Sequence, residues 1–113
     1  MSTTAELSAP PVESRQWYLY LVEMANGALY TGITTDVARR VAQHARGRGA
    51  RALRGKGPLT LRHAQVVGNH SDALKLEASI KRLSAESKRR WIERHRLSSL
   101  CHQIVIAPDP AAP

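Results

Sequence analysis

The sequence predicts an α+β fold, a three-stranded antiparallel sheet flanked by helices, with its elements in the order β-β-α-β-α-α. The first observation is a pair of aromatic and aliphatic segments, residues 17–22 and 28–33, on either side of an Asn26-Gly27 turn signal. This arrangement is typical of a β-hairpin. The second observation is that three later segments follow helix-capping residues and repeat apolar residues at helical spacing. A chain of 113 residues, 42% of them hydrophobic, suits one small globular domain.

The hairpin has two candidate registers, which differ in where they place its tyrosines. A two-residue type I′ turn puts Tyr20 and Tyr30 on opposite faces of the sheet. A three-residue loop, with Gly27 in the left-handed conformation of a G1 bulge, pairs Val22 with Tyr30 instead. We favour the second register because it separates an aliphatic face from a face of tyrosine hydroxyls, and the buried pattern of a strand sets its register. The aliphatic face then holds Leu19, Leu21, Leu29 and Ile33. The other face holds Tyr18, Tyr20 and Tyr30, with Gly32 beside them.

The remaining elements follow from caps and apolar spacing. One of residues 34–36 can cap a helix over residues 37–45. Residues 47–58 contain four glycines and four basic residues, which indicates a loop, and residues 59–67 favour a third strand. Two further helices complete the order, and their predicted caps are Ser71 and Ser84.

The charge indicates a polyanionic partner. Seventeen Lys and Arg residues oppose nine Asp and Glu residues, which gives a net charge of +8. Residues 37–71 contain no acidic residue at all, whereas a solubilising surface usually mixes both signs. A stretch of one sign attracts nucleic acid because each neutralised phosphate releases counterions. A basic helix on a membrane surface is the weaker interpretation, because this stretch is interrupted by glycines and lacks an apolar stripe.

Composition also gives the expected domain limits and compartment. We expect a flexible N-terminal tail at residues 1–16, a domain at 17–100 and a mostly flexible C-terminal extension at 101–113. No run of 18 apolar residues and no signal peptide is recognisable, so no membrane contact is expected. The single cysteine, Cys101, fits a reducing cytoplasm. A protein partner or a homodimer is not indicated.

Some residues are candidates for chemistry, and each also has a plainer interpretation. Tyr20 and Tyr30 are either core aromatics or hydroxyl donors in a site. Arg40 and His44 share one face of a helix, beside its apolar stripe, and are either surface and filler residues or groups that face a cleft. Glu77 is either an i,i+4 partner of a lysine or an oxygen ligand for Mg²⁺ or Mn²⁺.

The triplets Tyr18-Leu19-Tyr20 and Tyr30-Thr31-Gly32 carry a family resemblance. With residues 29–44, the basic loop 47–57 and residues 73–83, they make the chain similar to the GIY-YIG nuclease superfamily, most closely to its small stand-alone bacterial members. The first triplet has Tyr18 in place of its glycine, and the second has Thr31 in place of isoleucine. Many relatives carry an asparagine in the last helix, where this chain has Lys-Arg-Arg at 88–90.

The resemblance implies a role for each matching residue. Tyr30 is implied as the general base or its relay to the attacking water, and Tyr20 as its companion. Arg40 is implied to bind the scissile phosphate, His44 to assist proton transfer or hold phosphate, and Glu77 to hold a single divalent metal ion, Mg²⁺ or Mn²⁺. Gly32 is implied to leave room for backbone or substrate, and Gly27 is the structural residue that the predicted turn requires.

The function expected from charge and resemblance together is a metal-dependent endonuclease that hydrolyses phosphodiester bonds in DNA. It would be structure-selective rather than sequence-selective and act in repair or recombination, with RNA as the alternative substrate. The competing hypothesis is a nucleic-acid-binding protein with a nuclease-like fold and weak or no catalytic activity. In either case the expected nucleic-acid contacts are Arg39, Arg46, Arg48, Arg51, Arg54 and Lys56.

Overall fold

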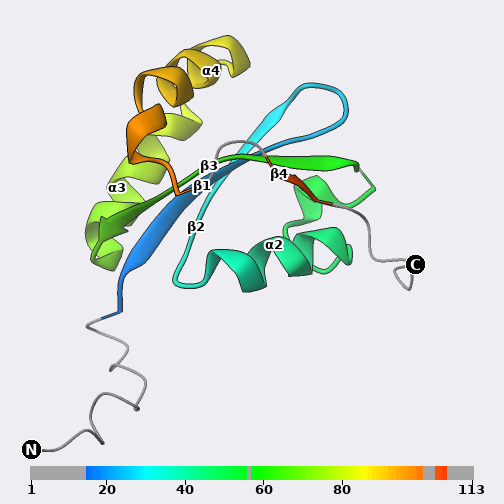
Figure 1. Cartoon of the computed structure of the whole chain (residues 1–113), viewed down its shortest axis with the longest axis horizontal. Coiled ribbons are helices and arrows are strands. Elements are labelled where there is room, and N and C mark those ends of the chain that lie inside the picture. The colour runs from blue at the N-terminus through cyan, green and yellow to red at the C-terminus, as the bar shows by residue number, and fades with distance from the viewer. Residues whose placement is uncertain (1–14, 56, 101–103, 107–113) are drawn as a thin grey trace, which may run out of the picture.

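A four-stranded antiparallel sheet with the strand order β2-β1-β3-β4 lies at the centre of the computed structural model (Figure 1). The structure describes residues 15–55, 57–100 and 104–106. Lys56, most of the predicted N-terminal tail and most of the C-terminal extension lie outside these residues. The strands are β1 (Trp17–Glu23), β2 (Leu29–Thr34), β3 (Leu59–Gly68) and β4 (Ile104–Ile106). The helices are α2 (Val37–Ala45), η2 (Arg51–Leu53), α3 (His70–Lys81), α4 (Ala85–Arg94) and η3 (Arg96–Ser98).

The hairpin between β1 and β2 has the register predicted from the buried pattern. Val22 pairs with Tyr30, and Tyr20 pairs with Gly32. Gly27 has a φ of 90°, and its N–H donates to the Met24 carbonyl at 2.9 Å, which closes the three-residue loop. The tyrosines at 20 and 30 therefore project from the same face of the sheet.

The two faces of the sheet are covered by different helices (Figure 1). On one face, Tyr20, Val22 and other buried residues pack with side chains of α2 and η2. On the other face, Leu19 and Leu21 pack against Ile80 of α3 and Trp91 of α4. β2 is the strand at one edge of the sheet, so the helical layers on the two faces of the sheet both end beside β2.

The predicted order β-β-α-β-α-α is confirmed, with some changes at the boundaries. Asp36 caps α2 by accepting from the Arg39 N–H, and Ser84 caps α4 by accepting from the Ser87 N–H. The predicted cap Ser71 was wrong: Asn69 caps α3, since its side chain accepts from the Asp72 N–H at 2.8 Å. Asn is as good a cap as Ser, so composition alone did not separate them. The predicted loop 47–58 contains the short helix η2.

The C-terminal extension contributes to the sheet, which the sequence interpretation did not include. Strand β4 pairs with residues 59–61 of β3. Its two isoleucines and one valine are β-branched residues that favour a strand. Three residues are too few to show an alternation of apolar and polar side chains, so the strand could not be recognised without its partner strand β3. None of the helices among the described residues combines the length and the apolar character that a membrane span requires.

Candidate functional site

Three aromatic rings meet on the face of the sheet covered by α2. The ring centroids of Tyr20 and Tyr30 are 6.2 Å apart. The His44 ring lies 5.7 Å from that of Tyr20 and 5.8 Å from that of Tyr30. The fold thus brings together three of the four residues predicted to be catalytic, from β1, β2 and α2.

A chain of hydrogen bonds fixes the protonation of His44. The Ala50 N–H donates to His44 Nδ1 at 3.3 Å, so Nδ1 carries no proton. In the neutral ring the proton then resides on Nε2, which lies 2.9 Å from Tyr20 Oη. His44 therefore donates to the tyrosine oxygen, and the hydroxyl proton of Tyr20 points to another acceptor.

Burial sets the charge state of this pair. Burial, together with the nearby positive charge of Arg40, lowers the pKa of His44 to about 4. Burial raises the pKa of Tyr20 to about 12, although a hydrogen bond from Arg40 opposes the increase. At neutral pH both groups are uncharged, so Tyr20 is a hydrogen-bond donor rather than a base.

Two glycines make room for the Tyr20–His44 pair. A Cβ on Gly32 would lie 2.5 Å from Tyr20 Oη, so a side chain there would displace the phenol. A Cβ on Gly49 would overlap His44 Nδ1. The space beneath Gly32 that the resemblance assigned to backbone or substrate is filled by the Tyr20 ring. Gly49 was missed from the sequence because it is one of several glycines in a basic loop.

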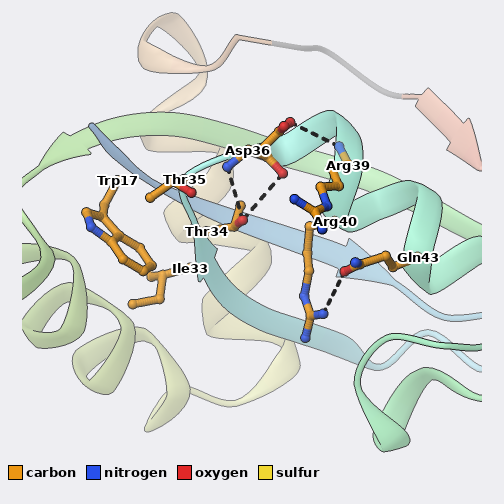
Figure 2. A pocket seen from close by; sticks show the side chains of 8 residues that line it. All are labelled: Trp17, Ile33, Thr34, Thr35, Asp36, Arg39, Arg40 and Gln43. Carbon is orange, nitrogen blue, oxygen red and sulfur yellow. Dashed lines mark hydrogen bonds between the residues drawn. The ribbon is translucent and has the colours of Figure 1, made fainter. Parts of the chain in front are cut away.

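Arg40 lies next to this pair at the rim of a pocket of about 300 Å³ (Figure 2). Its Nη1 donates to Gln43 Oε1 at 2.9 Å, one turn further along α2. The guanidinium is also close enough to Tyr20 to lower the pKa of its hydroxyl. Arg40 thus lies between the ring cluster and the pocket beside the edge strand β2. Neither Gln43 nor the pocket was predicted from the sequence.

Glu77 belongs to α3, in the layer on the opposite face of the sheet, yet its charge reaches the cluster. The carboxylate makes a minor contribution to the raised pKa of Tyr20, and α3 packs against the edge strand β2. Glu77 also forms the i,i+4 ion pair with Lys81 at 3.3 Å that was its plainer interpretation. The Glu77 side chain is 16% exposed.

The residues present fit a single hard metal ion. Within the described ranges, no three His, Cys, Asp or Glu side chains are grouped to enclose a metal. Mg²⁺ does not require such a cage, because it keeps several waters and binds through one or two carboxylates and substrate phosphates. Glu77, whose side chain is 16% exposed, offers one carboxylate of this kind.

The basic residues predicted to contact nucleic acid lie on the exposed surface of α2 and the loop after it. The described members are exposed: Arg39, Arg46, Arg48, Arg51 and Arg54. Lys56, the sixth, is outside the described residues. Arg62, on β3, is paired with Glu23 at 2.9 Å.

Two basic residues of α4 hold the β1–β2 hairpin. Lys88 Nζ donates to the Leu29 carbonyl at 2.9 Å, and Arg89 donates to the Gly27 carbonyl. Burial lowers the pKa of Lys88, and the charge of Lys81 adds to this effect. These contacts could not be recognised in the sequence because they join residues 59 and 62 positions apart.

Comparison with known proteins places the chain among relatives. Residues 16–95 match the family model described as the GIY-YIG catalytic domain. A UPF0213 protein of Pectobacterium carotovorum is 56% identical over 82 residues, which cover 73% of this chain and 83% of that protein. The UPF0213 protein YhbQ of Salmonella typhimurium is 56% identical over 85 residues, covering 74% and 85%. The solution NMR structure of the UPF0213 protein BH0048 from Bacillus halodurans is 37% identical, covers 70% of this chain and 84% of that one, and gives a TM-score of 0.47. The chain belongs to the GIY-YIG catalytic domain family.

Proposed function

We propose that this protein is a divalent-metal-dependent endonuclease that hydrolyses phosphodiester bonds in DNA. Membership of the GIY-YIG family gives the nuclease-type domain. The observation that carries the proposal is the Tyr20–His44 hydrogen bond beside Tyr30 and Arg40, within reach of the charge of Glu77. A protein that only binds nucleic acid needs positive charge, but it has no need of a carboxylate near its phosphate contacts.

Arg40 supplies the contact to the scissile phosphate. Its planar guanidinium can donate two parallel hydrogen bonds to phosphate oxygens and stabilise the charge that develops there. The hydrogen bond to Gln43 uses Nη1 and fixes the orientation of the group at the rim of the pocket. The guanidinium also donates to Tyr20, and its remaining N–H groups are left for the substrate.

The two tyrosines divide the work of handling protons. Tyr30, as general base or its relay, takes a proton from the attacking water. Tyr20 stays protonated because its pKa is about 12, and it is buried like His44, so it donates its hydroxyl hydrogen to Tyr30 and not to the substrate. His44 is too buried to meet a phosphate, with 3% of its surface exposed, and acts by holding Tyr20.

Glu77 would hold the metal ion, Mg²⁺ or Mn²⁺. When bound, such an ion supplies Lewis acidity and offsets negative charge at the phosphate. Lys81 must release the carboxylate, and its half-exposed side chain is free to swing into solvent, since 53% of it is exposed.

The exposed arginines of α2 and the following loop support a contact to the phosphate backbone. Such contacts position a nucleic acid without reading its sequence. We therefore propose recognition of DNA structure rather than sequence, in repair or recombination.

A nicking assay with matched variants tests the proposal. Wild-type chain is incubated with Mg²⁺ or Mn²⁺ and duplex, branched and single-stranded DNA. Tyr30→Phe should lower the cleavage rate by at least about 100-fold, whereas Tyr18→Phe, the same change outside the ring cluster, should not. Glu77→Ala should abolish metal-dependent cleavage, whereas Glu86→Ala removes an exposed i,i+4 carboxylate and should be silent.

Two results would overturn the proposal. Near-wild-type cleavage by Tyr30→Phe would remove the tyrosine from the chemistry. Binding to DNA without cleavage of any substrate, with either metal, would leave the nucleic-acid-binding alternative.

A further inference from the structure

The pocket beside Arg40 has two chemically different ends (Figure 2). At one end, the indole of Trp17 lies beside the aliphatic side chain of Ile33. At the other end, Arg39, Arg40 and Gln43 project from α2. The strand β2 ends between them, and its last residue, Thr34, also lines the pocket.

Trp17 is held in place from outside the pocket. The His70 ring stacks on the indole with centroids 4.3 Å apart and an interplanar angle of 29°. His70 does not line the pocket, so this contact supports the indole and leaves the rest of its surface for a ligand. A half-buried tryptophan anchored on one side and open on another is a stacking platform rather than part of the core.

Charge decides which part of a nucleotide suits each end. The two guanidinium groups attract a phosphate at the α2 end. Asp36 also lines the pocket, and its carboxylate is turned to the start of α2, where it accepts from the Arg39 N–H at 3.1 Å. A second phosphate beside this carboxylate would be repelled, while an uncharged base against Trp17 and Ile33 would not.

We propose that this pocket binds the nucleoside next to the scissile phosphate, with its base held out of the helical stack against Trp17. The inference rests on the proposed function, because it takes Arg40 as the ligand of the scissile phosphate. A volume of about 300 Å³ is at the small end for ligand sites, which suits one nucleoside and not a base pair. A base inside a duplex cannot present its flat surface to an indole. Trp17 thus selects substrates with an unpaired or displaced nucleotide at the cleavage position.

The test measures binding in the full-length Tyr30→Phe chain, so that it does not depend on cleavage. The probe is a five-nucleotide DNA strand with the fluorescent base 2-aminopurine at its centre. Stacking on Trp17 should quench its emission, and Trp17→Leu should remove the quenching and weaken binding about ten-fold. Leu97→Ala changes a side chain that is 98% exposed and should leave both unchanged.

A second measurement needs no variant at position 17, in case Trp17→Leu unfolds the chain. Replacing the central nucleotide of the strand by an abasic one should weaken binding by about the same factor, because the phosphates are kept and only the base is lost. Equal affinities for the two strands, or unchanged quenching in a folded Trp17→Leu chain, would overturn the proposal. Loss of nicking activity in the wild type would count against the proposed function alone, since neither binding result depends on it.

Discussion

The substitution Gly32→Ala tests the central contact of the site, the Tyr20 ring lying over the β2 backbone. A Cβ at position 32 would lie 2.5 Å from Tyr20 Oη and 2.6 Å from its Cζ. These atoms belong to a ring that is 1% exposed and hydrogen-bonded to His44, so the ring cannot move aside without breaking that bond. The alanine must therefore displace Tyr20 or distort the edge strand.

The expected cost follows from two contributions. Inserting a methyl group into a packed core costs about 1–3 kcal/mol, and leaving a buried hydrogen-bonding group without its partner costs a similar amount. The better strand preference of alanine offsets only about 0.5–1 kcal/mol. We expect Gly32→Ala to lower the free energy of unfolding by about 2–4 kcal/mol, measured by urea denaturation. Gly57→Ala is the matched control, because the nearest atom to its Cβ is 3.9 Å away.

A double-mutant cycle identifies Tyr20 as the cause. In a Tyr20→Leu background the obstructing ring atoms are gone, so Gly32→Ala should cost less than about 1 kcal/mol there. An equal cost in both backgrounds would show that the strain arises in the backbone and not from Tyr20. A cost below about 1 kcal/mol in the wild-type background would refute the close packing itself.

Two further predictions concern His44 and Glu77. The pKa of His44 is lowered from 6.5 to about 4, so the unfolded chain binds a proton in this window that the folded chain does not. The free energy of unfolding should be at its full value above pH 6.5 and should fall towards pH 4 by at most about 3 kcal/mol. Urea titrations at these two pH values should show a smaller loss in His44→Gln than in the wild type. The lowered pKa of His63 adds to the loss in the same direction in both chains. Lys81→Met should lower the Mn²⁺ concentration for half-maximal cleavage about 1.4- to 5-fold, since it removes a competitor worth about 0.2–1 kcal/mol for the Glu77 carboxylate. Arg90→Met, which frees Glu86 in the same way, is the control, and an unchanged metal requirement in Lys81→Met would argue against Glu77 as the ligand.

The fold was predictable because local signals agreed with the pattern of burial. The alternation of Leu19, Tyr20 and Leu21, with a glycine at position 27, was enough to choose the register of the hairpin. Cap residues located α2 and α4. Strand β4 was not predictable, because three residues form a strand only when β3 provides the hydrogen bonds.

The site was only partly predictable, because its chemistry depends on contacts across layers. The spacing of Arg40 and His44 showed that they share a helix face, but not that His44 would be buried with both ring nitrogens engaged. The second of those contacts comes from the backbone of Ala50, and a backbone donor has no sequence signature. The role of Gly49 depends on the same close approach and was hidden for the same reason.

The position of the site at an edge strand explains why residues from both layers can serve it. In the interior of a sheet, side chains on opposite faces are separated by the backbone and by neighbouring strands. At β2, α2 brings Arg40 from one face while α3 brings Glu77 from the other. An edge strand also exposes backbone groups to unwanted pairing. Here Lys88 binds the Leu29 carbonyl, so α4 protects part of this edge and fixes the strand that carries Tyr30. The remaining open part of β2, beside Thr34 and the pocket, is where a substrate can approach.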